Sequence, residues 1–238
     1  GEAPGTSAHT NPNMLAAIGR DTIYTNVALT PGGEPWWEGL TEDVPAGLQD
    51  WQGRPYTPGN GPAAHPNSRF TVTSKRLASY SPQAEAPRGV PISAILFGGR
   101  RASVTPLVVQ SLSWQHGVFV GASMGSETTA AATGQVGVVR RDPMAMLPFC
   151  GYNMADYWSH WLSFADKSDR LPQVFQVNWF RRDAKGRFIW PGFGDNLRVL
   201  RWVLERCEGR GAAVRTPIGY VPAPGALDTT GLALDNAD

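Results

Sequence analysis

The sequence predicts an α/β protein, because short apolar runs typical of buried strands occur beside two segments with helical periodicity. The run Pro91–Gly98 (PISAILFG) indicates a buried strand that ends at a glycine pair. Between Gly151 and Lys167, apolar residues recur at spacings of three and four, which predicts an amphipathic helix. A second helix is predicted from about Asn196 to Cys207, with Asp195 or Asn196 as its N-cap.

Residues 1–91 and residues 92–238 differ in composition. Residues 1–91 are rich in Pro, Gly, Asn and Thr, which predicts a turn-dense segment with short strands such as Thr22–Leu29. Residues 92–238 contain both helices and most of the buried strand candidates. Within them, Pro106–Trp114 is weakly helical and Gly117–Ala122 is a candidate buried strand. The chain is therefore expected to have two segments of different character.

The segment Ser126–Gly137 (SETTAAATGQVG) is small and polar, with no large apolar side chain before Val136. Few apolar contacts could hold it in place, which predicts a mobile loop or lid. A short exposed helix through its alanines is the alternative, and the two interpretations are compatible.

Composition and charge set bounds on function. With 42% hydrophobic and 17% charged residues, the 238-residue chain is an ordinary globular sequence. The net charge of +1 gives no global reason to expect nucleic acid or a membrane as partner, and no run reaches the length of a membrane span. Cys150 and Cys207 are expected to be buried thiols, although one bridge between them stays open. Of 21 basic residues, 18 are arginine, which suits phosphate recognition but also a G- and C-rich genome.

Two arginine-containing turns are candidate anion sites. HPNSRF (65–70) places Asn67 and Arg69 around Ser68, and FGGRR (97–101) places Arg100 and Arg101 after two glycines that let backbone approach a ligand. An ordinary pair of surface arginines is the alternative for the second turn.

The third candidate is VNWFRRDAKGRFIWPGFGDN (177–196), which has five aromatic residues among four cations. Such rings can stack on a flat heteroaromatic ligand while Asn196 binds its edge. Phe180 and Phe193 are expected to lie close enough to hold a planar base between them. A nucleotide- or RNA-binding module is one alternative, and a structural role with the rings in the core is another. No G-x-x-x-x-G-K-[ST] loop or metal-ligand spacing of the four histidines occurs. The residues alone indicate a binder of phosphate and base with incomplete catalytic equipment.

Seven strings occur in the order typical of one enzyme family: HPNSRF, ILFGGRR, SWQHGVFVGA, SETTAAA, RRDPMAMLPFCGYNMADYW, VNWFRRDAKGRFIWPGFGDN and RVLRWVLER. In these the chain resembles GTP-dependent phosphoenolpyruvate carboxykinase over nearly its whole length. The variants PWWEGL and RRDPMAMLPF look closest to actinobacterial members. WPGFGDN resembles the guanine pocket of this branch and not that of ATP-dependent enzymes.

The resemblance implies a mixed sheet with flanking helices, forming part of the C-terminal nucleotide-binding domain. The N-terminal domain, the phosphate loop and the C-terminal helices are expected to lie outside the chain. The implied reaction is gluconeogenic and converts oxaloacetate and GTP to phosphoenolpyruvate, GDP and CO₂. The implied metals are Mn²⁺ and Mg²⁺, with ligands outside this chain, so the chain alone is expected to be inactive. The implied parent is cytoplasmic and monomeric, with no nucleic-acid or membrane partner.

The resemblance also implies roles for individual residues. Arg69 and Arg100 match phosphate-contacting arginines, are the implied catalytic residues and are expected to converge on one anion site. Asn67 and Ser68 match positions beside the oxaloacetate or phosphoenolpyruvate site. The implied nucleotide contacts, beyond the two arginines, are Trp179, Phe180, Phe188, Phe193, Gly194, Asp195 and Asn196. The implied lid consists of Ser126, Glu127, Thr128, Thr129, Ala130, Ala131, Ala132, Thr133, Gly134, Gln135, Val136 and Gly137.

Overall fold

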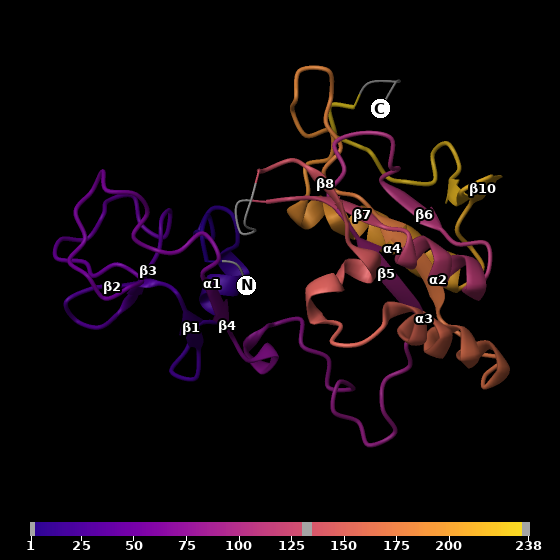
Figure 1. The fold of residues 1–238 in the computed structure, drawn as a ribbon, viewed down its shortest axis with the longest axis horizontal. Coiled ribbons are helices and arrows are strands. Elements are labelled where there is room, and N and C mark those ends of the chain that lie inside the picture. Colours follow the sequence, from indigo (N-terminus) through magenta and orange to yellow (C-terminus); the bar gives the residue numbers. More distant parts are fainter. Residues whose placement is uncertain (1–2, 130–134, 235–238) are drawn as a thin grey trace. The chain divides into compact units, whose positions relative to one another are not determined.

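The computed structural model describes residues 3–129 and 135–234, which fall into two compact units, Gly1–Val90 and Pro91–Asp238. Figure 1 shows the path of the chain through both units. No helix in these described ranges is long and apolar enough to cross a membrane.

The first unit consists mainly of turns and loops, as its composition predicts. The expected strand at Thr22–Leu29 is interrupted at Asn26, whose φ of 58° takes the chain out of the extended conformation. Two antiparallel pairs result, β1 with β4 and β2 with β3. The elements of this unit are α1 (Pro12–Ala16), β1 (Ile23–Thr25), β2 (Ala28–Leu29), β3 (Pro35–Trp36), β4 (Arg69–Thr71) and the 3₁₀ turn η1 (Ser74–Arg76).

Two small apolar clusters form the interior of the first unit. In one, Trp37 stacks on Phe70 with ring centroids 5.4 Å apart, and its indole N–H donates to the Thr6 carbonyl at 2.8 Å. The other gathers Trp36 and Leu48 with two buried alanines. In each cluster a buried tryptophan is the largest side chain, Trp37 in the first and Trp36 in the second.

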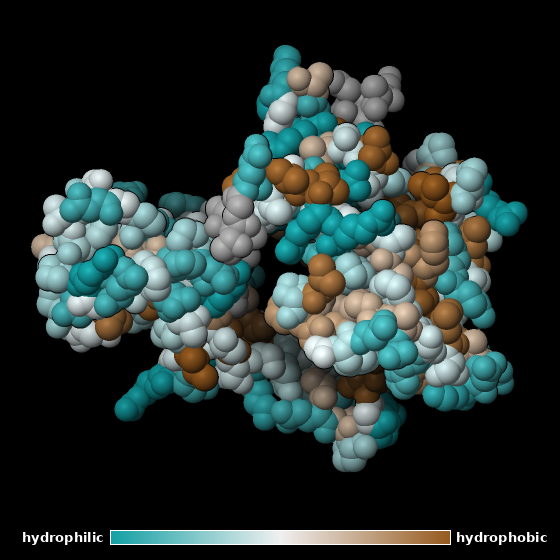
Figure 2. Space-filling view, in the orientation of Figure 1, coloured by the Kyte–Doolittle hydropathy of each residue, from teal (hydrophilic) through white to brown (hydrophobic). Residues whose placement is uncertain are grey.

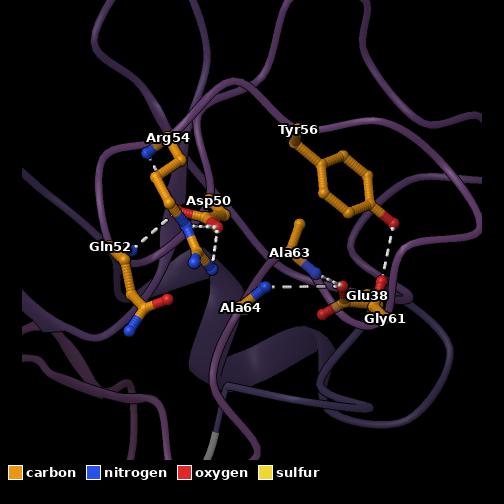
Figure 3. A network of polar contacts seen from close by, with 8 residues as sticks. All are labelled: Glu38, Asp50, Gln52, Arg54, Tyr56, Gly61, Ala63 and Ala64. Atoms are coloured by element: carbon orange, nitrogen blue, oxygen red, sulfur yellow. Dashed lines mark hydrogen bonds and ion pairs between the residues drawn. The ribbon is translucent and has the colours of Figure 1, made fainter.

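Acidic side chains replace regular secondary structure in the first unit (Figure 3). One oxygen of Glu38 accepts from the backbone N–H groups of Ala63 and Ala64 at 2.5 and 3.4 Å. Asp50 binds the N–H groups of Gln52 and Arg54 and also the Arg54 guanidinium. These bonds satisfy backbone donors that a sheet or helix would otherwise pair.

The second unit is built on a five-stranded mixed sheet in the order β10-β11-β6-β9-β5. Only β5 and β9 are parallel, and the other neighbours are antiparallel. A separate antiparallel pair joins β7 to β8. The strands are β5 (Ala94–Gly98), β6 (Val108–Gln110), β7 (Gly125–Glu127), β8 (Val139–Arg141), β9 (Gln173–Val177), β10 (Ala213–Thr216) and β11 (Gly219–Pro222). The predicted α/β fold with a mixed sheet is confirmed.

Helices cover both faces of this sheet (Figure 1). Val174 of β9 packs in a cluster with side chains of α2 and α3, whereas Phe175 packs with Trp202 of α4. This alternation follows from the strand, whose successive side chains point to opposite faces. The helices are α2 (Trp114–Ala122), α3 (Met154–Leu162) and α4 (Asn196–Cys207), with 3₁₀ turns η2 (Pro143–Ala145), η3 (Leu147–Phe149), η4 (Ser163–Asp166) and η5 (Phe193–Asp195).

Two sequence predictions for the second unit are wrong. Residues 106–114 were expected to be weakly helical, but Val108–Gln110 form the central strand β6, buried along its whole length. Residues 117–122 were expected to be a strand but belong to α2. There Gly117 and Gly121 lie one turn apart and let the helix approach the sheet, since a Cβ on Gly117 would stand 2.5 Å from Cβ of Val174. Both predicted helices at 151–167 and 196–207 are confirmed, as α3 with η4 and as α4.

The surface of the second unit exposes several large apolar side chains, and Figure 2 shows brown patches between polar ones. Phe149 and Phe193 are the most exposed aromatic rings, at 81% and 73%. Both cysteines are unpaired and half-buried, so the expectation of two buried thiols is only partly met. Burial raises the pKa of the Cys207 thiol, which favours its protonated form.

Candidate functional site

The arginine turn (residues 99–102) follows β5 and is held by the first residues of the predicted lid. The backbone N–H of Arg100 donates to Ser126 Oγ at 3.0 Å, and the Arg100 carbonyl accepts from the Glu127 N–H at 2.8 Å. The Glu127 carboxylate then accepts from the Ala102 N–H at 2.7 Å. The turn is thus pinned by groups about 25 positions away in the chain.

Gly99, the first residue of this turn, has a packing role that the sequence did not indicate. A Cβ on Gly99 would lie 3.2 Å from the Gly125 carbonyl oxygen and 3.2 Å from Cε of Met124. A Cβ on Gly98 would be in ordinary contact with Val177. The space left by Gly99 is therefore filled by β7 and its neighbour, and the glycine lets two protein segments approach each other.

The aromatic hairpin (residues 179–190) leaves the sheet directly after β9. Its two arms pair through Arg182 and Phe188, and its tip is a turn closed by Asp183. The backbone N–H of Arg187 hydrogen-bonds the Asp183 carboxylate and lowers the pKa of that carboxyl. The Arg182 N–H also donates to the Ala102 carbonyl at 2.9 Å, which ties the hairpin to the arginine turn.

Two of the predicted base-contacting rings lie together, each beside an arginine. Phe180 and Phe188 meet edge-to-face with centroids 6.0 Å apart. The guanidinium carbon of Arg100 lies 4.0 Å from the Phe180 centroid, and that of Arg182 lies 4.1 Å from the Phe188 centroid. Both are cation–π distances. A planar ligand would stack on the opposite ring face or displace the arginine.

The segment after the hairpin presents Phe193 to solvent. Gly192 has a φ of 78° and Phe193 a φ of 48°, so the chain makes a left-handed bend that turns the Phe193 ring outward. Among the described residues, Phe193 makes no ring contact with Phe180 or Phe188. The predicted sandwich of a base between Phe180 and Phe193 stays a prediction.

Asn196 is held by a tryptophan of the core. Trp190 is 4% exposed, and its indole N–H donates to Asn196 Oδ1 at 2.8 Å. This bond orients the amide and engages its oxygen within the protein. Trp179 is partly buried against the same cluster.

The neighbours of Asn196 have structural partners. Asp195 occupies the N-cap position of α4, as predicted, but its side chain caps no backbone N–H and binds Arg198 Nε at 2.8 Å. Gly194 has open space around its Cβ position, so neither packing nor a positive φ requires glycine there.

The predicted lid begins and ends in a β-hairpin. Ser126 and Glu127 belong to β7, which pairs with β8 beyond the lid. Thr128 extends the pairing, because its N–H donates to the Val138 carbonyl and its carbonyl accepts from the Gly137 N–H, both at 2.9 Å. Residues 130–134 lie outside the described part of the chain, so the expected mobility of the lid stays a prediction.

The first unit contains the other predicted substrate residues. Asn67 is exposed, and its N–H donates to His65 Nδ1 at 2.9 Å. Ser68 is fully buried, and its carbonyl accepts from the Ala3 N–H and from the Arg69 guanidinium. Arg69 is half-buried at the start of β4. Because Arg69 and Arg100 lie in different units, their shared anion site stays a prediction.

Sequence reasoning missed Asn178, which is 1% exposed and hydrogen-bonded to both the arginine turn and the aromatic hairpin. A polar residue directly after the apolar strand QVFQV was the available signal. The described ranges contain no group of three or more His, Cys, Asp or Glu residues that could hold a metal ion.

Comparison with known proteins identifies the family of the chain. A family model described as "Phosphoenolpyruvate carboxykinase C-terminal P-loop domain" matches residues 1–238. The chain is 59% identical over 236 residues to phosphoenolpyruvate carboxykinase (GTP) of Chlamydia abortus, covering 98% of the chain and 39% of that protein. It is 55% identical over 233 residues to the same-named protein of Anaeromyxobacter sp. strain K, with 98% and 39% covered.

The chain thus spans about two fifths of the length of these relatives. They do not support the actinobacterial affinity suggested by the sequence variants, which stays a prediction. The match over all 238 residues shows that the chain belongs to the GTP-dependent phosphoenolpyruvate carboxykinase family and lies within its C-terminal P-loop domain.

Proposed function

We propose that this chain supplies the guanine-binding pocket, a phosphate-contacting arginine and the lid of an enzyme that converts oxaloacetate and GTP to phosphoenolpyruvate, GDP and CO₂. The observation that supports this most is the contact between Arg100 and Phe180, at 4.0 Å from guanidinium carbon to ring centroid. It places a predicted phosphate ligand beside a predicted base ligand, although the two are 80 positions apart in the sequence.

The proposed reaction depends on positioning of the two substrates and on neutralisation of phosphate charge. Loss of CO₂ from oxaloacetate leaves an enolate, whose oxygen attacks the γ-phosphorus of GTP while the bond from that phosphorus to the β,γ-bridging oxygen breaks. Arg100 would balance negative charge on the γ-phosphoryl group, and the rings would fix the base. The lid would exclude water from the enolate. The resemblance implies divalent metal ions whose ligands lie outside this chain, and such ions would supply further neutralisation of phosphate charge.

The same rings and cations could serve RNA binding, and nucleotide preference separates the two functions. A guanine pocket should bind GDP more tightly than ADP. Competition by a single-stranded RNA should then depend little on the bases of that RNA. An RNA surface should show affinity that falls steeply with salt and has little base preference.

The test is competition binding of GDP, ADP and a single-stranded RNA to the full-length protein and to two variants. Phe193→Ala removes an exposed ring from the proposed pocket, and Phe149→Ala removes an equally exposed ring from η3. We expect Phe193→Ala to reduce the affinity for GDP by about tenfold, because stacking of a base on an aromatic ring contributes about 1–3 kcal/mol. Phe149→Ala should leave it unchanged. Equal binding of GDP and ADP by the unmodified protein would refute the proposal.

We also propose that the 238-residue chain alone does not turn over oxaloacetate and GTP. The metal contribution that it would lack amounts to several kcal/mol of transition-state stabilisation. A coupled assay with manganese on a sample of confirmed mass tests this. Robust metal-dependent formation of phosphoenolpyruvate by the chain alone would contradict it.

A further inference from the structure

We propose that Asn178 is a positioning residue that holds the phosphate-contacting arginine turn and the base-contacting aromatic hairpin in a fixed relative position. This inference rests on the function proposed above. Asn178 lies between the end of β9 and the aromatic hairpin and is 1% exposed. Its own N–H donates to the Leu107 carbonyl at 2.9 Å, so its backbone remains anchored to the sheet.

The Asn178 side chain uses its whole hydrogen-bonding capacity. Oδ1 accepts from the backbone N–H groups of Arg101 and Phe180, both at 3.2 Å. Nδ2 donates to the backbone carbonyls of Arg101 at 2.9 Å and Thr105 at 3.1 Å. A primary amide has two donor hydrogens and two acceptor lone pairs, and all four are engaged here.

These four bonds join segments that are far apart in the chain. Arg101 and Asn178 are 77 positions apart, and the amide pairs with both the N–H and the carbonyl of Arg101, as a neighbouring strand would. Arg100 precedes one end of this connection, and Phe180 forms the other. The amide therefore fixes the backbone from which both side chains leave, and their 4.0 Å contact follows.

No other side chain of similar size meets these demands. Leucine would leave the part-buried carbonyls of Arg101 and Thr105 and two backbone N–H groups without these partners, which costs free energy for each group that stays unsatisfied. Aspartate would keep the two accepted bonds but would lose both donated bonds and set a negative charge against two carbonyl oxygens. Asparagine alone combines both kinds of bond in this volume.

The experiment measures two affinity ratios in the full-length protein by calorimetry. The GTP:GDP ratio reports the γ-phosphate contact of Arg100, and the GDP:ADP ratio reports the base pocket around Phe180. We expect Arg100→Ala to reduce mainly the first ratio and Phe180→Ala mainly the second. Asn178→Ala should reduce both by about tenfold, although all four hydrogen bonds of the Asn178 side chain are to the protein backbone.

Gln110→Ala is the matched control for lost stability. Gln110 is another buried amide of the same sheet, 8% exposed, but its side chain binds Gln173 and Arg206 at 2.5 and 2.6 Å. This variant should also lower the unfolding temperature while leaving both ratios within about twofold. A folded Asn178→Ala protein that keeps either ratio would overturn the inference.

Asn178→Asp makes the test independent of whether Asn178→Ala folds. It retains the bond from the Phe180 N–H and loses those to the carbonyls of Arg101 and Thr105, so the GTP:GDP ratio should fall several-fold more than the GDP:ADP ratio. If both ratios of Asn178→Asp equal those of the unmodified protein, this inference is overturned while the proposed function stands. An unmodified protein without guanine preference would instead overturn the proposed function, and this inference with it.

Discussion

The two units contain the same five-residue turn in different settings. It reads DWQGR (50–54) in the first unit and DAKGR (183–187) in the second. In both, one aspartate oxygen accepts from the N–H groups two and four residues later at 2.9 to 3.0 Å. The other oxygen accepts from the arginine Nε at 2.9 Å, and the glycine has a φ of 81° or 76°.

The surroundings of the two turns differ. In the first unit the turn pairs backbone N–H groups that no sheet pairs, in a region whose only described strands form two-stranded pairs. In the second it closes the hairpin that brings Phe180 next to Phe188. One local sequence therefore makes one local structure in both places, and its relation to function depends on which side chains it brings together.

The interiors of the units differ in the same way. The first unit buries two small aromatic clusters, and its turns depend on glycines with positive φ. The second packs helices on both faces of a sheet, and Gly117 and Gly121 serve close approach between layers. The following predictions test these differences.

Removal of a central tryptophan should have the largest effect in either unit. Trp202→Ala in the second unit and Trp37→Ala in the first each delete a ring that is 1% exposed and an indole N–H bonded to a carbonyl. We expect the free energy of unfolding to fall by about 3–5 kcal/mol in each case. Hydrogen exchange read on the amides of the mutated unit measures it.

Leu204→Ala on the exposed face of α4 is the control for these substitutions. Its side chain is 58% exposed, so the change should stay within about 0.5 kcal/mol. A loss below about 1 kcal/mol for Trp37→Ala would show that the stacked Trp37–Phe70 pair is not the core of the first unit.

Glycine substitutions should separate the two uses of glycine. Gly117→Ala should destabilise by about 1–3 kcal/mol through overpacking against Val174, and Gly53→Ala by about 1–2 kcal/mol through its φ of 81°. Asparagine tolerates a left-handed conformation, so Gly53→Asn should cost less than Gly53→Ala. Gly117→Asn should cost more than Gly117→Ala. Thermal unfolding measures all four, and the same order at both sites would contradict this distinction.

The matched turns allow a paired test of function. Asp183→Asn removes the ion pair with Arg187 at 2.8 Å, and Asp50→Asn removes the corresponding pair with Arg54, also at 2.8 Å. We expect Asp183→Asn to lower the GDP:ADP affinity ratio about threefold. The loosened hairpin should reduce the difference in binding free energy by about half of the 1.4 kcal/mol that corresponds to a tenfold change in affinity. Asp50→Asn should leave the ratio unchanged. Equal effects would show that the hairpin turn has no special relation to the base pocket.

The smallest expected effect is a dependence of stability on acid pH. The backbone N–H of Arg54 lowers the pKa of Asp50, and that of Arg187 lowers the pKa of Asp183. Each folded pKa therefore lies below the unfolded value of about 3.9, so the ionised groups stabilise the fold above that pH. This contribution is lost as the pH falls through the folded pKa.

The free energy of unfolding, measured at pH 7 and at pH 3, should therefore fall less with acid in the Asp50→Asn and Asp183→Asn proteins than in the unmodified protein. An equal loss in all three would mean that other carboxyls determine the acid sensitivity.

The sequence by itself determined the features that depend on neighbouring residues. The amphipathic periodicity of α3 and α4 predicted both helices, and the Pro and Gly content predicted the irregular first unit. The aromatic and arginine motifs identified candidate residues, since their types alone limit what they can bind. Strand β5 was likewise evident from its apolar run before a glycine pair.

Only the tertiary structure decided what depends on distant partners. Val108–Gln110 became a strand because β9 and β11 pair with it on either side, and residues 117–122 became helix because two glycines fit against β9 and β5. The bonds of Asn178 and Glu127 to the arginine turn join positions 25 to 77 apart. Pairing across such distances is set by packing of the whole unit, and periodicity within a short window contains no information about it.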